Sequence, residues 1–139
     1  GKRYRYRIIN SVIPNVFWRR YAVEEPESLD LDAMRRSADL LLGEHDFKAF
    51  TSAKKSKKST VRRIDEIRIE QKGDLVEFVF TGNGFLHHMI RILMGTLLEV
   101  GKGIRTPESI TEVLESGDRA KAGPLVPAKG LVLEEVFYT

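Results

Sequence analysis

The chain has 139 residues, enough for one domain with a sizeable core, and its formal net charge is only +3. It contains no cysteine, which excludes disulfides and cysteine-ligated metals and fits the cytoplasm. No membrane-spanning stretch or secretory-signal pattern appears. Because strand-like sequence begins directly at Gly1, with no initiator methionine, we expect a piece of a longer protein.

Basic residues are concentrated in two blocks. Residues 2–20 and residues 48–63 contain lysine and arginine but no acid, whereas residues 24–46 between them are mainly acidic. This distribution predicts a cationic surface and a polyanionic partner.

The first half of the chain is predicted to contain a strand, a helix and a turn. Residues 3–10 alternate arginine with tyrosine and isoleucine, which predicts a half-buried strand with a basic outer face. Asp30 can cap a helix of regular apolar spacing that Gly43 closes. Residues 46–50 are typical of a short turn that packs two phenylalanines, and residues 51–60 form a loop rich in lysine and serine.

The second half adds a strand pair, two helices and a final strand. Residues 61–71 and 74–81 predict two strands joined by a tight turn, and the apolar residues 83–101 predict a buried helix. The remaining predicted elements are a helix from Thr106-Pro107 to Gly117, a loop over residues 119–129 and a strand over residues 131–138. The order β-α-β-β-α-α-β predicts an α+β fold, a mostly antiparallel sheet with helices packed on one face.

An arginine lies in the middle of the apolar segment. On a helical wheel one narrow stripe holds Gly84, His88, Arg91, Gly95 and Glu99. A guanidinium stays protonated, and arginines that reach solvent usually lie near helix ends, so we favour a buried ion pair for Arg91. Glu99 is two turns away, so the anion is expected from outside this chain. The small residues beside Arg91 leave room for a backbone, a carboxylate or a substrate.

The three histidines give little support for a metal site. On a helix His87 and His88 diverge by about 100°, and His45 has no partner at ligand spacing, so packed or hydrogen-bonded histidines are favoured and no metal is predicted. Asp46 could act as an acid or base, but an aspartate that caps a turn is favoured. The sequence contains no phosphate-binding glycine loop and no nucleophile elbow.

Two features suggest RNA binding, and each has an ordinary alternative. A basic cluster is formed by Lys54, Lys55, Lys57, Lys58, Arg62 and Arg63. Contact with phosphates and a solvated, mobile loop are both open interpretations of this cluster. Tyr4 and Tyr6 are most simply core aromatics on a strand, with stacking on a nucleobase as the sharper alternative.

Four blocks of sequence carry a family resemblance. They are KRYRYRI at residues 2–8, LLGEHDFKAFTS at 41–52, FLHHMIR at 85–91 followed by MGTLLEVGKG, and AGPLVPAKGLVLEEVFY at 122–138. Together, in this order, they resemble the C-terminal half of the TruA family of bacterial tRNA pseudouridine synthases. The resemblance covers nearly the whole chain.

The resemblance implies an enzyme that isomerises uridine to pseudouridine in the anticodon stem-loop of tRNA, without metal or organic cofactor. It implies a cytoplasmic homodimer that holds tRNA in a basic cleft between subunits, with the aspartate of a GRTD motif as nucleophile. By the same resemblance Arg91 pairs with that aspartate, Tyr4 packs on the target base, and Leu131 lies on a strand that lines the pocket.

The main departure from the family is that no GRTD motif occurs in residues 1–139. The nucleophile is therefore expected in an N-terminal half outside this chain, and the chain alone is expected to be inactive. Two alternatives remain, a non-catalytic RNA-binding α+β module and a dimerisation domain whose apolar helix is an interface. Arg91 discriminates the enzyme from both alternatives, because only the enzyme needs a carboxylate opposite this side chain.

Overall fold

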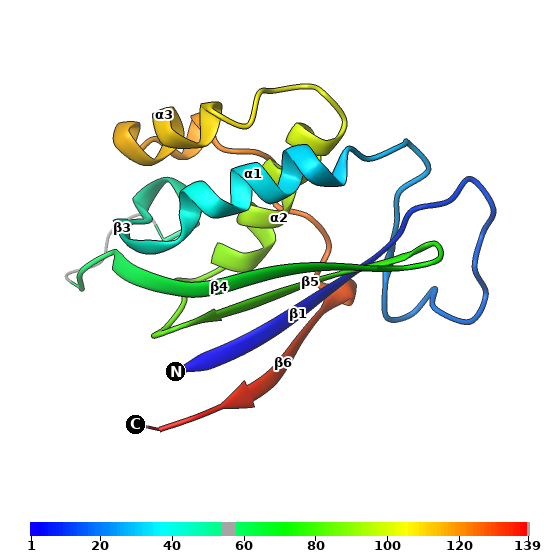
Figure 1. Cartoon of the computed structure of the whole chain (residues 1–139). Helices are drawn as coiled ribbons and strands as arrows, with labels where there is room; N and C mark the ends of the chain where they lie inside the picture. The colour runs from blue at the N-terminus through cyan, green and yellow to red at the C-terminus, as the bar shows by residue number, and fades with distance from the viewer. Residues whose placement is uncertain (54–57, 139) are drawn as a thin grey trace.

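The computed structural model describes residues 1–53 and 58–138, which have the predicted α+β architecture (Figure 1). In this part of the chain, six strands form one sheet in the order β2-β1-β5-β4-β3, and β6 also pairs with β1. The pairing of β1 with β2 is parallel, and the other pairings are antiparallel. The three α-helices lie on one face of the sheet, and the termini lie side by side at one end.

The observed elements follow the predicted order, with two short edge strands added. The strands are β1 (Lys2–Ile9), β2 (Val23–Glu24), β3 (Gly43–Asp46), β4 (Val61–Lys72), β5 (Leu75–Gly82) and β6 (Leu131–Val136). The helices are α1 (Leu31–Leu41), α2 (Met89–Gly101) and α3 (Ser109–Ser116). Short 3-10 helices are η1 (Lys48–Phe50), η2 (Arg119–Lys121) and η3 (Ala128–Gly130).

The core lies between the helices and the inner face of the sheet. Tyr6 of β1 and Phe78 and Phe80 of β5 are fully buried there. Burying each such side chain stabilises the fold by roughly 1.5–3 kcal/mol relative to leaving it in water. In α2 every residue is buried except Arg91 and Glu99. The contacts of these two charged residues therefore bear most directly on function.

Local capping explains where α1 begins and how the following turn is held. Asp30 accepts a hydrogen bond from the Ala33 N–H at 3.0 Å, which confirms the predicted helix cap. The helix ends at Leu41, and Gly43, at φ +90°, opens β3 instead of capping the helix. Asp46 accepts from the Lys48 N–H at 3.1 Å, so the prediction of a turn-capping aspartate is confirmed.

The helix predicted over residues 83–101 is shorter than expected, because α2 begins only at Met89. The carbonyl oxygen of His87 accepts hydrogen bonds from the Thr51 hydroxyl and the Ser52 N–H, and His88 adopts a left-handed conformation that ends any helix. The rings of His87 and His88 therefore stack, with centroids 3.7 Å apart, and the prediction that they diverge on a helix is wrong.

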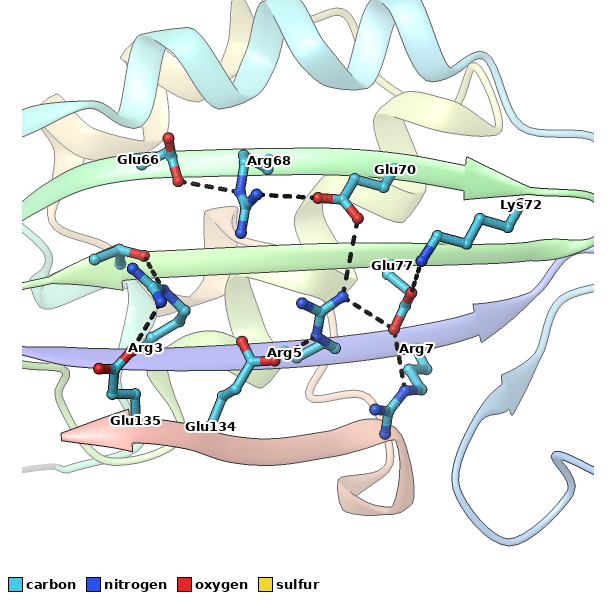
Figure 2. A network of polar contacts seen from close by, with 11 residues as sticks. Arg3, Arg5, Arg7, Glu66, Arg68, Glu70, Lys72, Glu77, Glu134 and Glu135 are labelled. Carbon is cyan, nitrogen blue, oxygen red and sulfur yellow. Dashed lines mark hydrogen bonds and ion pairs between the residues drawn. The ribbon is translucent and has the colours of Figure 1, made fainter.

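The outer face of β1 is not the free basic surface that the sequence predicted. Figure 2 shows its arginines interleaved with glutamates from β4, β5 and β6. Glu77 of β5 accepts from Arg5 at 3.1 Å and from Arg7 at 3.2 Å, and Arg3 pairs with Glu135 of β6 at 2.8 Å. Arginines with no acidic residue nearby in sequence are thus paired with glutamates of other strands of the sheet. This face is therefore not the polyanion-binding surface that the sequence predicted.

Two further findings concern the described residues only. No helix in residues 1–53 and 58–138 is long and apolar enough to cross a membrane. Within the same ranges, no group of three or more histidine and carboxylate side chains is arranged to hold a metal ion.

Candidate active site

A pocket of about 190 Å³ opens where the start of α2 meets β1, β6 and η3. Its lining residues are Tyr4, Phe85, Leu86, His88, Met89, Ile90, Arg91, Ala128 and Leu131. The fold thus brings Tyr4, Arg91 and Leu131, three residues separated widely in sequence, to one cavity. The wall is mostly apolar, with a guanidinium and an imidazole among its polar groups, which is the composition expected of a small-ligand site.

Arg91 is half-buried and is held by a backbone carbonyl. Its Nε–H donates to the carbonyl oxygen of Val126 at 2.7 Å. Among the described residues it forms no ion pair, and Glu99 pairs instead with Arg105 at 3.1 Å. The prediction that Arg91 is buried is therefore wrong in degree, and its anionic partner stays a prediction. The guanidinium is thus fixed at one nitrogen, and Arg91 is one of the residues that line the pocket.

The room beside Arg91 that the small residues predicted is filled by backbone. A Cβ at Gly95, one turn after Arg91, would overlap the carbonyl oxygen of Pro124. The Gly123 N–H donates to the hydroxyl of Thr96 at 2.8 Å, which ties residues 123–127 to α2. Glycine at position 95 therefore lets this segment approach closely enough for Val126 to reach Arg91.

The two tyrosines of β1, for which core packing and base stacking were both open, occupy different environments. Tyr6 is fully buried, its hydroxyl donates to the Pro127 carbonyl at 2.6 Å, and burial raises its pKa. Tyr4 is half-buried and lines the pocket, with the Phe85 ring 5.4 Å away in an edge-to-face arrangement. Tyr6 is thus a core residue, and Tyr4 is the tyrosine whose ring borders the cavity.

His88 is a pocket residue that the sequence analysis did not select. It directly precedes α2 with φ 62° and ψ 8°, and its Nδ1 lies 3.1 Å from the Ser52 hydroxyl. Partial desolvation, together with His87 and Arg91, lowers the pKa of the imidazole. Histidine tolerates the left-handed region better than most residues, so it is compatible with a break before the helix. The surrounding apolar sequence nevertheless favoured a continuous helix over residues 83–101.

Arg62 and Arg63 of the predicted RNA-binding cluster lie at the start of β4, and not all members of the cluster can be placed. Lys54, Lys55 and Lys57 lie outside the described residues, whereas Lys58 is exposed. Arg62 donates through Nη1 to the carbonyl oxygens of Ser59 at 2.8 Å and Val61 at 2.7 Å.

Arg63 is partly neutralised by a neighbour. Its Nε lies 2.7 Å from Asp65, and this hydrogen bond raises the arginine pKa. We therefore expect Arg63 to attract a phosphate more weakly than Arg62 does. A role in RNA binding stays a prediction for every residue of the basic cluster.

Two arginines of the first basic block differ from those on the sheet. Arg19 and Arg20 are exposed and form no ion pair with any residue in 1–53 or 58–138. The Lys129 ammonium donates to the Arg19 carbonyl at 3.3 Å, and Lys129 follows Ala128 of the pocket wall. Arg19, Arg20 and Lys129 thus keep part of the predicted cationic surface, whereas the arginines of β1 are neutralised by glutamates.

Comparison with known proteins gives a consistent result. Residues 37–139 match the family described as tRNA pseudouridine synthase. The chain is 50% identical over 139 residues to a tRNA pseudouridine synthase A of Myxococcus xanthus and 47% identical over 137 residues to that of Brevibacillus brevis. It is 44% identical over 138 residues to that of Acetivibrio thermocellus.

Each of these alignments covers 99% of this chain but only 52%, 56% and 57%, respectively, of the relative. The chain therefore spans about half the length of the curated relatives it matches.

Proposed function

The chain belongs to the tRNA pseudouridine synthase family, and from that premise we propose that it is the C-terminal half of an enzyme that isomerises uridine to pseudouridine in the anticodon stem-loop of tRNA. The observation that carries the proposal is the meeting of Tyr4, Arg91 and Leu131 at one pocket. The enzyme acts in the cytoplasm, as a homodimer.

The reaction exchanges one bond to the ribose for another. The bond between N1 of uracil and C1′ of ribose breaks, and a bond between C5 and C1′ forms. The hydrogen on C5 leaves as a proton and N1 gains a proton, so no electrons are gained or lost overall. An aspartate from the half outside this chain is the nucleophile that starts the exchange.

Arg91 is suited to hold that aspartate. The Val126 carbonyl fixes Nε, and Arg91 lines the cavity with its two terminal nitrogens not engaged by any described residue. A carboxylate beside this cation stays ionised and is oriented by charge-assisted hydrogen bonds. Half-burial strengthens the interaction relative to one in open water, because less solvent screens the charges.

Tyr4 and Leu131 shape the space for the base. The Tyr4 ring offers a flat face for a uracil turned out of its stack, and Phe85 supports that ring from the side. Leu131 provides an apolar wall at the start of β6. The cluster from Lys54 to Arg63 contributes sequence-independent attraction to tRNA phosphates.

The proposal is tested by tritium release from tRNA that carries uridine tritiated at C5. The full-length parent protein and the 139-residue chain are assayed side by side. We expect release with the parent and none with the chain, because the chain lacks the aspartate nucleophile. No release by the parent on competent tRNA would favour a non-catalytic RNA-binding module. Release by the chain alone would show that the nucleophile lies within residues 1–139.

A further inference from the structure

His88 has a backbone conformation that no other non-glycine residue in the described parts of the chain shares. Its φ is 62° and its ψ is 8°, directly before the first turn of α2. A side chain in this left-handed region strains the backbone, and such strain persists where surrounding contacts hold it, often at functional sites. The side chain lines the pocket together with Tyr4 and Arg91.

Contacts from one segment hold this conformation in place. The Thr51 hydroxyl and the Ser52 N–H both donate to the His87 carbonyl, at 3.0 and 3.4 Å. The Ser52 hydroxyl lies 3.1 Å from Nδ1 of His88. The peptide before His88 and the imidazole itself are thus both anchored to residues 51–52. An imidazole held at the backbone and at one ring nitrogen has little rotational freedom left.

The anchored ring presents one free nitrogen. Partial desolvation, with the positive charge of Arg91 nearby and His87 stacked alongside, lowers the pKa of His88 and favours the neutral imidazole. When the Ser52 hydroxyl donates to Nδ1, the single ring proton lies on Nε2. No described residue forms a hydrogen bond with Nε2, and His88 is one of the residues that line the pocket, so this donor is not used within the described parts of the chain.

We propose that His88 positions the substrate by donating a hydrogen bond from Nε2 to a carbonyl oxygen of the target uracil. This inference rests on the proposed function. Isomerisation requires the freed base to turn so that C5 replaces N1 opposite C1′. Turning uracil about the line through N3 and C6 exchanges N1 with C5 and also exchanges the two carbonyl groups. One fixed donor therefore finds a carbonyl oxygen both before and after the turn, and it can hold the base throughout.

The test uses the full-length parent protein, tritium-release kinetics and two matched variants. Asparagine tolerates the left-handed backbone but its amide cannot reach the position of Nε2, so His88→Asn removes the donor with little backbone strain. We expect kcat to fall about 100-fold, as when one preorganised donor is removed, with tRNA affinity within about three-fold. His45→Asn is the control, and its kcat should stay within about three-fold of the parent protein because His45 does not line the pocket and does not contact His88.

A second variant separates a chemical role from a structural one. His88→Gly keeps the backbone conformation and leaves a space, so added imidazole should restore part of the lost rate. A normal kcat in His88→Asn, or a loss in His88→Gly that imidazole does not restore, would overturn the inference while the proposed function stands. An inactive parent protein would overturn the proposed function and this inference with it.

Discussion

Gly95 and Pro124 are in backbone contact, so close that any side chain at position 95 would overlap the Pro124 carbonyl oxygen. The contact brings residues 123–127 against α2, where Val126 accepts from Arg91. The next carbonyl of this segment, that of Pro127, accepts a hydrogen bond from the hydroxyl of the buried Tyr6. The position of the pocket arginine therefore depends on a glycine one helical turn away.

Gly95→Ala should both destabilise the protein and weaken the site. The added methyl group has no space to enter, and overpacking of this kind costs about 1–3 kcal/mol. Because the segment that holds Arg91 must move, we expect tritium release by the parent protein to fall more than the loss of folded protein explains. Gly84→Ala is the control, since its new Cβ would make only ordinary contacts of 3.7 Å with Arg62. Thermal unfolding and tritium release are measured for both variants, and equal effects of the two would contradict this argument.

Arg91→Ala in the full-length parent should remove most turnover and leave tRNA binding within a few-fold. If Arg91 holds the nucleophilic aspartate as proposed, loss of the cation leaves that carboxylate without a partner, so we expect a decrease of at least about 100-fold in kcat. Arg91→Lys should also be impaired, because an ammonium cannot hold the Val126 carbonyl and a carboxylate in the same planar arrangement. Filter binding and single-turnover tritium release measure the two effects. Parallel loss of binding and turnover would argue for a role in RNA affinity instead.

Tyr4 can be tested by separating its ring from its hydroxyl. Stacking needs only the aromatic face, so Tyr4→Phe should keep kcat within a few-fold, whereas Tyr4→Leu should lower it strongly. Tyr4→Phe keeps the edge-to-face contact with Phe85, whereas Tyr4→Leu loses it at a cost of about 0.5–1.5 kcal/mol, so thermal stability should change little in the first variant and modestly in the second. Tritium-release kinetics of the full-length variants provide the measurement. Unchanged rates in Tyr4→Leu would remove this tyrosine from the site, and a large loss in Tyr4→Phe would assign a role to the hydroxyl.

Sequence patterns predicted the main elements well, because β1 buries alternate residues and α2 is buried at all but two of its residues. The alternation of β1, the apolar run of α2 and the Asp30 cap of α1 are all present in the structure. The two short strands β2 and β3 were not predicted, since strands of two and four residues are formed by pairing with a neighbour and leave no periodic signal.

The errors share one physical origin, which is contact between residues far apart in sequence. The start of α2 moved to Met89 because residues 51–52 bind the carbonyl of His87. The charge of β1 was overestimated because its glutamate partners lie on strands about 70 and 130 residues away. Arg91 was identified by its unusual place in an apolar run, but its actual partner, a carbonyl 35 residues on, has no sequence signature.

The basic cluster should contribute to tRNA affinity unevenly. Arg62→Gln should reduce the salt dependence of tRNA binding by about 0.7 in the log–log slope for one lost phosphate contact. Arg63→Gln should have a smaller effect, because Arg63 is already paired with Asp65 at 2.7 Å. Arg68→Gln is the control, since Arg68 pairs with two glutamates on the outer face of the sheet. Affinities are measured over a series of salt concentrations with the full-length protein. A slope that none of the three variants changes would exclude this cluster from the RNA interface.

Glu77 should make the stability of the fold depend on acidity. Burial alone raises its pKa, but Arg5 and Arg7 outweigh burial and the net pKa is lowered from 4.5. The folded state therefore binds fewer protons than the unfolded state, so this stabilisation is present above about pH 4.5 and is lost as pH falls through the lowered pKa. Glu77→Gln should lower the free energy of unfolding by about 3 kcal/mol at pH 7, because two arginines lose a largely buried partner. In this variant the free energy of unfolding should also fall less steeply as the pH is lowered. Glu66→Gln, which breaks an exposed pair with Arg68, should cost less than about 1 kcal/mol. Urea unfolding between pH 3 and 7 measures both, and an acid limb equally steep in Glu77→Gln would assign the pH dependence to other carboxylates.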